Sequence, residues 1–166
     1  MIPDPAPTVR QLLAFYLEAG VDCALADGTA VSNAATVSSA TADPNGSNDT
    51  ANASVTASNP PPVIGAVSPS PSLLWPPNHK MVAVTVSYTA SDNCTAAPGC
   101  TLAVTANEPL AAGDVVLVDA HHVQLRAERL GSGRGRTYTI AVSCTVAVGS
   151  VGTRTAAVTV PHDQGN

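Results

Sequence analysis

The stretch Met81-Val-Ala-Val-Thr-Val-Ser-Tyr-Thr89 places valines and a tyrosine at every second position, between smaller or more polar residues. Such alternation predicts a β-strand with one buried face, because successive side chains of a strand point to opposite sides. Comparable runs rich in Val, Ala and Thr follow at residues 101–106, 115–118, 123–126, 137–143 and 153–160. Five or six such strands in about ninety residues, separated by turn residues, predict an antiparallel β-sandwich.

The first third of the chain predicts a smaller β-structure. Residues 30–38 and 50–57 are β-like, and the Pro- and Asn-Gly-containing stretch 43–49 between them predicts a turn. Residues 12–17 fit a strand or a short helix, and the following Gly20 favours the strand. Few large apolar side chains are present, so this part is expected to be incomplete, partly disordered or supported by the second domain.

The proline run after residue 58 predicts a domain boundary. Asn59-Pro-Pro-Pro62 is expected to form an extended hinge, because consecutive prolines favour the polyproline conformation. The predicted organisation is therefore a partial domain at residues 1–58, a linker at 59–63, a β-sandwich at 64–162 and a tail at 163–166.

Composition argues against nucleic acid and membrane as partners. The 166 residues carry a net charge of −5, and only 11% are charged. Nucleic-acid binding requires a concentrated basic surface, which the chain lacks. Four arginines, Arg126, Arg129, Arg134 and Arg136, surround a Gly-rich turn, where a solvated hairpin tip is the expected arrangement. No run of eighteen apolar residues is present, so membrane insertion is not expected.

Cysteine usage and overall texture favour an extracellular or cell-surface location. The start of the chain has no basic segment followed by an apolar one, so a signal peptide is not predicted, and a fragment of a larger secreted protein is the simplest interpretation. Cys94 and Cys100 lack the spacing of paired zinc ligands, and export would favour a disulfide. Spacing favours Cys94–Cys100, with Cys144 as the alternative partner because its strand should neighbour the one starting at Cys100.

Six short motifs occur in order along residues 64–162. They are Leu74-Trp-Pro-Pro-Asn-His-Lys-Met-Val82, Ser91-Asp-Asn-Cys94, Asn107-Glu-Pro109, Asp119-Ala-His-His-Val-Gln-Leu-Arg-Ala-Glu-Arg129, Tyr138-Thr-Ile-Ala-Val-Ser-Cys144 and Val160-Pro-His-Asp163. Together they resemble the hyalin-repeat-like Ig modules of secreted bacterial proteins. One departure is Val146-Ala-Val-Gly-Ser-Val-Gly152, which stands where such modules usually carry an Asp-x-Ser-Gly-Asn turn. The resemblance implies an Ig-like antiparallel β-sandwich.

A second resemblance concerns residues 12–57. The stretch Ala24-Leu-Ala-Asp-Gly-Thr-Ala-Val-Ser-Asn-Ala-Ala-Thr-Val-Ser-Ser39, followed by Asp43-Pro-Asn45 and Asn48-Asp-Thr-Ala-Asn-Ala53, is similar to the last third of Ig-like repeats found along bacterial surface proteins. This implies a partial Ig-like repeat before the sandwich.

The expected strand directions gather polar residues at one end of the sandwich, namely Asn78, His79, Glu108, Glu128, His162 and Asp163. Calcium takes six to eight oxygen ligands, which Asn78, Glu108, Glu128 and Asp163 would supply in part. The alternative is that the carboxylates accept hydrogen bonds from turn amides and pair with Lys80 or Arg129. That alternative is favoured, because no Asp-x-Asp-x-Asp loop is present.

The aromatic and imidazole side chains allow two interpretations each. Trp75 is predicted to plug the edge of the sandwich, and its alternative role is to stack on a sugar ligand. His121 and His122 are neighbours on a strand and should face opposite sides, so a zinc ion shared by these two is not expected. A packed or solvent-facing histidine is favoured over the alternative, a zinc site that one of them forms with His79 or His162.

No sequence motif for catalysis is present, so the chain is not expected to be an enzyme, although a hydrolase with an unmarked site stays an alternative. The prediction is a non-catalytic structural spacer that contacts neighbouring domains of the same polypeptide and needs no cofactor. The main alternative is an adhesin or carbohydrate-binding module that binds surface glycans or proteins, with calcium as its stabilising ion.

Overall fold

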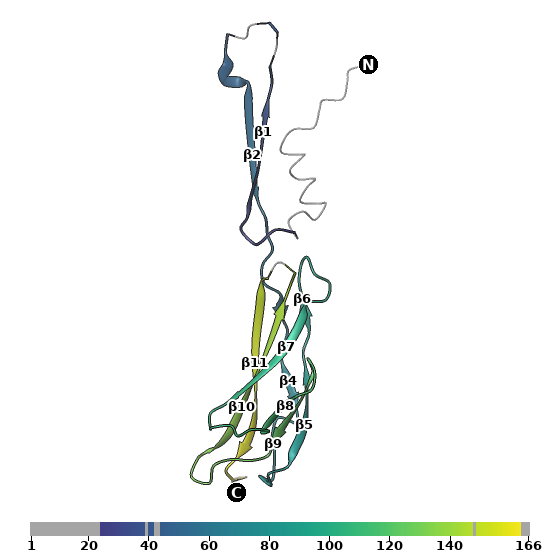
Figure 1. Ribbon diagram of the computed structural model, residues 1–166, viewed down its shortest axis with the longest axis vertical. Coiled ribbons are helices and arrows are strands. Elements are labelled where there is room, and N and C mark those ends of the chain that lie inside the picture. Colours follow the sequence, from purple (N-terminus) through teal and green to yellow (C-terminus); the bar gives the residue numbers. More distant parts are fainter. Residues whose placement is uncertain (1–23, 39, 42–43, 148, 164–166) are drawn as a thin grey trace. The chain divides into compact units, whose positions relative to one another are not determined.

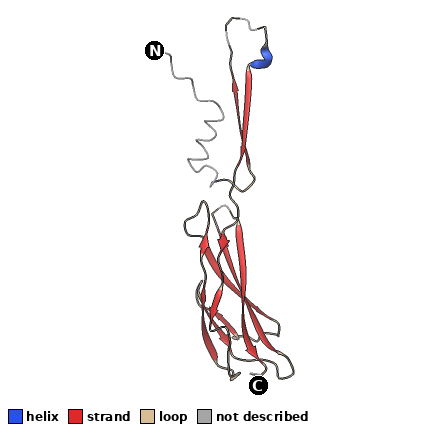
Figure 2. Cartoon of the chain, turned by 180° about the vertical axis from the view of Figure 1, so that it is seen from behind, coloured by secondary structure: helices blue, strands red, loops and turns tan. Residues whose placement is uncertain are grey.

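The computed structural model describes residues 24–38, 40–41, 44–147 and 149–163, and in this part of the chain it is all-β (Figures 1 and 2). The predicted fold class is confirmed at this level, whereas the predicted strand at residues 12–17 lies outside the described residues. No helix in the described ranges is long and apolar enough to span a membrane. The chain divides into two compact units, one ending at Pro60 and one beginning at Pro61.

The first unit contains one antiparallel hairpin. Strand β1 (Ala30–Thr36) pairs with β2 (Thr50–Thr56), and a short 3-10 turn η2 (Gly46–Asn48) precedes β2. Both strands were predicted from the sequence. At the base of the hairpin, Asn59 donates hydrogen bonds from its backbone N–H to Asp27 Oδ1 and from Nδ2 to the carbonyl of Leu25, each at 3.0 Å. These bonds hold the chain at the entry and exit of the hairpin together.

The second unit contains two main sheets. One has the strand order β4-β5-β9-β8 and the other β11-β10-β7, while β3 and β6 form a small additional ladder. The bounds are β3 (Val63–Ile64), β4 (Ser68–Ser70), β5 (Met81–Ser87), β6 (Ala90–Ser91), β7 (Gly99–Ala106), β8 (Val115–Leu117), β9 (His122–Arg126), β10 (Gly135–Thr145) and β11 (Val151–Pro161). All these pairings are antiparallel.

The core lies between the two main sheets, which makes the second unit a β-sandwich. It is built from the alternate residues of both sheets, including Val84, Val86, Val123, Leu125, Tyr138, Ile140, Val142, Val158 and Val160. Burying one such aliphatic side chain stabilises a fold by roughly 1.5–3 kcal/mol. The alternating pattern of the sequence therefore becomes a single continuous core.

The outer face of the β11-β10-β7 sheet consists of small uncharged residues. In register across the sheet lie Thr101, Ser143 and Thr153, then Ala103, Ala141 and Thr155, then Thr105, Thr139 and Ala157. Residues of this set on β7 and β11 are exposed. The same strands thus place large apolar side chains inward and hydroxyl or methyl groups outward.

The segment after β4 crosses from one main sheet to the other. Leu73 forms a parallel bridge with Thr159, whose carbonyl accepts a hydrogen bond of 2.8 Å from Leu74 N–H. Leu74 is buried at 2% exposure, whereas Trp75 is 42% exposed. The prediction that Trp75 plugs the sandwich edge is therefore wrong. In an extended segment neighbouring side chains point to opposite sides, so Leu74 fills the core and Trp75 faces outward.

Gly135, the first residue of β10, has a backbone φ of 107°. A Cβ atom there would lie 2.6 Å from the carbonyl oxygen of Val160. We expect Gly135→Ala to lower the free energy of unfolding by about 2 kcal/mol or more, since an unfavourable φ alone costs roughly 1–3 kcal/mol. Urea denaturation measures the change.

Gly131 provides the matched control for this substitution. It lies in the same turn region without a positive φ, and a Cβ atom added there would have nothing within 4 Å. Gly131→Ala is expected to change the stability by less than about 0.5 kcal/mol. Equal unfolding midpoints for the two variants would contradict a steric requirement at Gly135.

Candidate functional site

Charged and polar side chains converge at the pole of the sandwich where β7 and β9 end and β8 and β10 begin. We call Glu108, Asp114, Arg126, Arg136 and Tyr138 the polar cluster. Three of its charged members are almost fully buried: Asp114 at 2% exposure, Arg136 at 3% and Glu108 at 8%. The two arginines match the two carboxylates in charge, so the cluster is neutral as a whole.

Arg136 lies at the centre of the polar cluster. Its Nε donates to Glu108 Oε2 at 3.2 Å, and its Nη1 donates to Asp114 Oδ2 at 3.0 Å. Nη2 donates to the carbonyl of Pro109 at 3.3 Å. The planar guanidinium group suits this arrangement, because its N–H groups diverge in fixed directions and reach several acceptors together.

Arg126 joins the cluster to the loops around it. Its Nε donates to Asp114 Oδ1 at 2.8 Å, so the two arginines bind different oxygens of one carboxylate. Its Nη1 donates to the carbonyl of His79 at 2.9 Å, and Nη2 to that of Gly113 at 3.2 Å. The segment before β5 and the loop before β8 are thereby tied to the end of β9.

Tyr138 connects the polar cluster with the hydrophobic core. Its ring is fully buried, and its hydroxyl donates to the carbonyl of Arg126 at 2.8 Å. The same hydroxyl accepts a hydrogen bond of 3.2 Å from Arg136 Nη1. Burial raises the pKa of the Tyr138 phenol, which keeps the hydroxyl protonated and able to donate.

Asp114 is held in its ionised form. Burial by itself raises the pKa of this carboxyl, but hydrogen bonds from Ala111 N–H, Arg126 and Arg136 outweigh that effect. The net result is a pKa below the ordinary value of 3.8. A carboxylate that accepts several charge-assisted hydrogen bonds remains ionised even when it is almost fully buried.

We expect the second unit to lose stability as the pH falls below about 4, where aspartate begins to protonate in the unfolded chain. Because the folded-state pKa of Asp114 is lowered, its contribution is fully present above this range and is lost as the pH falls through the folded-state pKa. Urea midpoints at pH 7, 4 and 3 measure the effect. Asp114→Asn should show a shallower pH dependence than the wild type, and parallel curves would contradict the prediction.

The arginines near the Gly-rich turn do not form one solvated tip as the sequence suggested. Arg136 is buried and Arg126 is mostly covered, whereas Arg134 is exposed. Arg129 donates from Nη2 to the carbonyl of His162 at 2.7 Å. The reason lies in the strand register, since Arg136 has the same inward orientation as Tyr138 two residues later on β10.

The four calcium candidates do not form one site. Asn78 Oδ1 accepts a hydrogen bond of 3.1 Å from Lys80 N–H, while Glu108 binds Arg136. Glu128 lies 3.5 Å from His79 Nδ1, and Asp163 lies 3.5 Å from His162 Nδ1. Among the described residues no group of three or more His, Cys, Asp or Glu side chains is placed to hold a metal ion. Each candidate has a local partner, so the predicted calcium set is not assembled.

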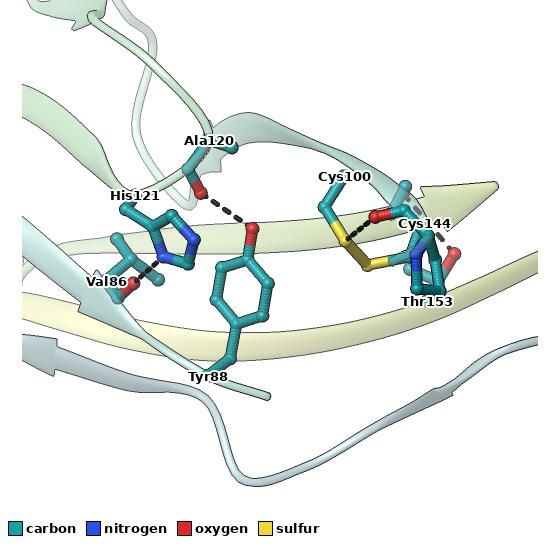
Figure 3. Close-up of a disulfide and its surroundings, with 9 residues drawn as sticks. Val86, Tyr88, Cys100, Ala120, His121, Cys144 and Thr153 are labelled. Carbon is teal, nitrogen blue, oxygen red and sulfur yellow. Dashed lines mark hydrogen bonds between the residues drawn. A yellow bond between two sulfur atoms is a disulfide. The ribbon is translucent and has the colours of Figure 1, made fainter. Parts of the chain in front are cut away.

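The imidazole rings of the adjacent histidines have different partners. His121 stacks on Tyr88 with ring centroids 4.4 Å apart, and its Nδ1 lies 3.0 Å from the carbonyl of Val86 (Figure 3). His122 pairs instead with Asp119 at 2.9 Å. Because a carbonyl only accepts, the Nδ1 of His121 carries the proton.

The disulfide joins Cys100 to Cys144 with a Cα–Cα distance of 4.0 Å (Figure 3). The favoured pairing of Cys94 with Cys100 is therefore wrong, and the alternative partner Cys144 is confirmed for Cys100. The physical reason is register, because Cys100 on β7 lies directly opposite Cys144 on β10. None of the described cysteines is free.

Two open hollows flank this disulfide at the pole opposite the polar cluster. One, of about 330 Å³, is lined by Leu102, Leu117 and Val118 among others. The other, of about 290 Å³, is lined by Tyr88, His121 and the loop before β7. Cys100 and Ala120 line both, so the hollows meet beside the Cys100 side chain.

Asp114, Arg136 and Tyr138 were not recognised as site residues from the sequence. Tyr138 belongs to one of the six motifs, but its hydroxyl partner is twelve residues away on another strand. Asp114 follows a Gly and precedes a short strand, which resembles an ordinary turn. One sequence signal could have found them. Arg136 lies two residues before Tyr138 and therefore faces the same side of β10 as the apolar residues, and an arginine that faces inward requires buried carboxylates as partners.

No protein-family model matches this chain, and neither a curated protein nor a solved structure shows a significant match.

Proposed function

We propose that the second unit is an Ig-like module that serves as a non-catalytic spacer between neighbouring domains of a larger secreted or cell-surface bacterial protein. The arginines of the polar cluster donate hydrogen bonds to acceptors of the protein itself, including the carboxylates of Asp114 and Glu108. These bonds hold the loops around the cluster together, so the cluster suits structural support better than catalysis.

Strand order supports the Ig-like assignment. Constant-type Ig domains place strands A, B, E and D in one sheet and C, F and G in the other. The order β4-β5-β9-β8 opposite β11-β10-β7 follows that scheme strand by strand. One departure is the disulfide, which joins β7 to β10 within one sheet, whereas antibody domains join strands B and F across the two sheets.

The observation that carries the spacer proposal is the position of the chain's entry and exit. A Cβ on Gly152 would overlap the carbonyl of Pro62, so the entering chain contacts the start of β11. The chain leaves after Pro161, at the opposite end of the same strand. Eleven residues at a rise of ~3.3 Å make this separation about 35 Å. Each such module would hold its two neighbours that far apart.

One face of the second unit agrees with a spacer. The outer face of the β11-β10-β7 sheet presents threonine, serine and alanine without charged side chains between them. Such a face remains solvated and provides little that would bind a particular partner. The polar and buried charged groups gather instead at the pole where the chain exits.

Distance measurements between the two poles test the spacer. Spin labels at Val63 and Asp163, both exposed, should report one narrow distribution centred at about 35 Å in the full chain, as the length of β11 implies. The distribution should not change between low and high salt. A broad or salt-dependent distribution would contradict a rigid spacer.

The alternative function, carbohydrate binding, is favoured by one observation. Trp75 is 42% exposed, close in sequence to Leu73, which is 48% exposed. A glycan array probed with the full chain distinguishes the functions. Saturable binding that disappears in Trp75→Ala and persists in Leu73→Ala would favour the binding module, and absence of binding by the wild type would favour the spacer.

A further inference from the structure

We propose that the Cys100–Cys144 disulfide is a thiol-exchange site, at which an external dithiol attacks Cys100 and Cys144 is the leaving group. The substrate class is a small dithiol, or a protein that presents one on a narrow loop. This reaction would make the stability of the second unit depend on the redox state of its surroundings.

The two sulfurs differ in access. Cys144 is fully buried in the core, whereas Cys100 is partly exposed and lines both hollows described above. Ala120, the other residue shared by the hollows, has a small side chain, and its carbonyl accepts a hydrogen bond of 2.9 Å from the Tyr88 hydroxyl. Pro98 O lies 3.5 Å from Cys100 Sγ on the loop side. An incoming thiolate therefore approaches Cys100 Sγ and not Cys144 Sγ.

The chemistry follows from this asymmetry. A thiolate of the dithiol forms a bond with Cys100 Sγ as the Cys100–Cys144 bond breaks, and the electron pair leaves with Cys144, which takes up a proton. The second thiolate of the reagent then displaces Cys100 as a thiolate, which is protonated by solvent. The dithiol is oxidised to its disulfide and the protein cystine is reduced to two thiols.

The facing positions of the two cysteines select dithiols over monothiols. Cys144 stays directly opposite Cys100 and can attack the mixed disulfide within the protein, so the adduct readily reverts when the attacking reagent has one thiol. A second thiol in the same molecule resolves the mixed disulfide before reversal. The ladder between β7 and β10, which runs from Tyr138↔Ala106 to Thr145↔Gly99, keeps the two strands paired after reduction.

The test uses the full wild-type chain under native conditions. Exposure to excess 2-mercaptoethanol, which has no second thiol to resolve the adduct, followed by acid quenching and peptide mapping, identifies which cysteine carries the mixed disulfide. We expect adducts on Cys100 to exceed those on Cys144 at least about tenfold, because access decides which sulfur is attacked. Equal adducts, or reaction only in denaturant, would overturn the proposal.

A substitution in the hollow provides an independent test. Ala120→Phe should cover Cys100 and slow reduction of the disulfide several-fold. Ala103 lies on β7 with Cys100 but on the exposed outer face of the sheet, so Ala103→Phe should leave the rate of reduction unchanged. An unchanged circular dichroism spectrum establishes that each variant is folded. Equal reduction rates for two folded variants would contradict attack through the hollow. If Ala120→Phe does not fold, the adduct ratio in the wild type still decides the question.

Discussion

Arg136→Met should destabilise the second unit by about 3–5 kcal/mol, the usual consequence of removing one partner from a buried ion pair. The substitution deletes the hydrogen bonds to Glu108 Oε2 and Asp114 Oδ2 but leaves both carboxylates almost fully buried. Arg126 still binds Asp114 through Oδ1, so Glu108 loses more than Asp114 does. Methionine retains much of the aliphatic volume, which limits the contribution of lost packing.

Arg134 provides the matched control for the buried arginine. It lies two residues earlier, carries the same charge and is exposed, so Arg134→Met should change stability by less than about 0.5 kcal/mol. Urea denaturation of the wild type and both variants at pH 7 gives the comparison. Similar midpoints for Arg136→Met and Arg134→Met would mean that the polar cluster does not stabilise the fold.

Arg136→Lys separates charge from geometry. Lysine retains the positive charge but replaces the guanidinium fork by a single ammonium group, which cannot reach the same divergent acceptors. We expect a stability between those of the wild type and Arg136→Met. A lysine variant as stable as the wild type would show that charge alone is sufficient.

The longer strands of both units were predictable because alternation is a local property, whereas the short strands β3, β4 and β6 were not predicted. In the Met81–Thr89 stretch, every second side chain faces the core, and β5 forms there over Met81–Ser87. Residues 137–143 were predicted as a strand, and β10 extends this run at both ends, from Gly135 to Thr145. Elements defined by their own period can be read from the chain without knowledge of their partners.

The polar cluster depends on contacts between distant residues and was only partly predictable. Strand directions correctly brought Glu108 and Glu128 to the same pole as Asn78 and Asp163. They did not show that Arg136 lies inward and occupies the carboxylates that calcium would need. The parity of Arg136 with Tyr138 indicates which side the arginine faces. The carboxylates that it meets come from loops far away in the chain, and the sequence alone leaves those contacts undetermined.

The disulfide shows the same limit. The short spacing of Cys94 and Cys100 suggested a clip across one turn, whereas the structure pairs Cys100 with a cysteine 44 positions away. Antiparallel register places Cys100 and Cys144 directly opposite each other, and the two side chains are joined there. Closeness in the sequence was therefore a weaker guide to the pairing than the expected order of the strands. That order was the reason for naming Cys144 as the alternative partner.

Removal of this cross-link should have the second large effect. Cys100→Ala/Cys144→Ala is expected to lower the free energy of unfolding by about 4 kcal/mol, because chain-entropy arithmetic for a closed loop of this length gives that value at 25 °C. The melting temperature should fall by roughly 15 °C, given a shift of ~4 °C per kcal/mol for a unit of about one hundred residues. Thermal unfolding under non-reducing conditions measures the change.

Loss of packing must be separated from loss of the cross-link, since Cys144 is fully buried and belongs to the core cluster. Cys100→Val/Cys144→Val supplies two side chains of similar volume at the same facing positions without a covalent bond. If loop closure in the unfolded chain is the main effect, the valine and alanine pairs should be destabilised to within about 1–2 kcal/mol of each other, the difference reflecting filled volume. Recovery of wild-type stability by the valine pair would instead show that the disulfide acts mainly by filling the space between β7 and β10.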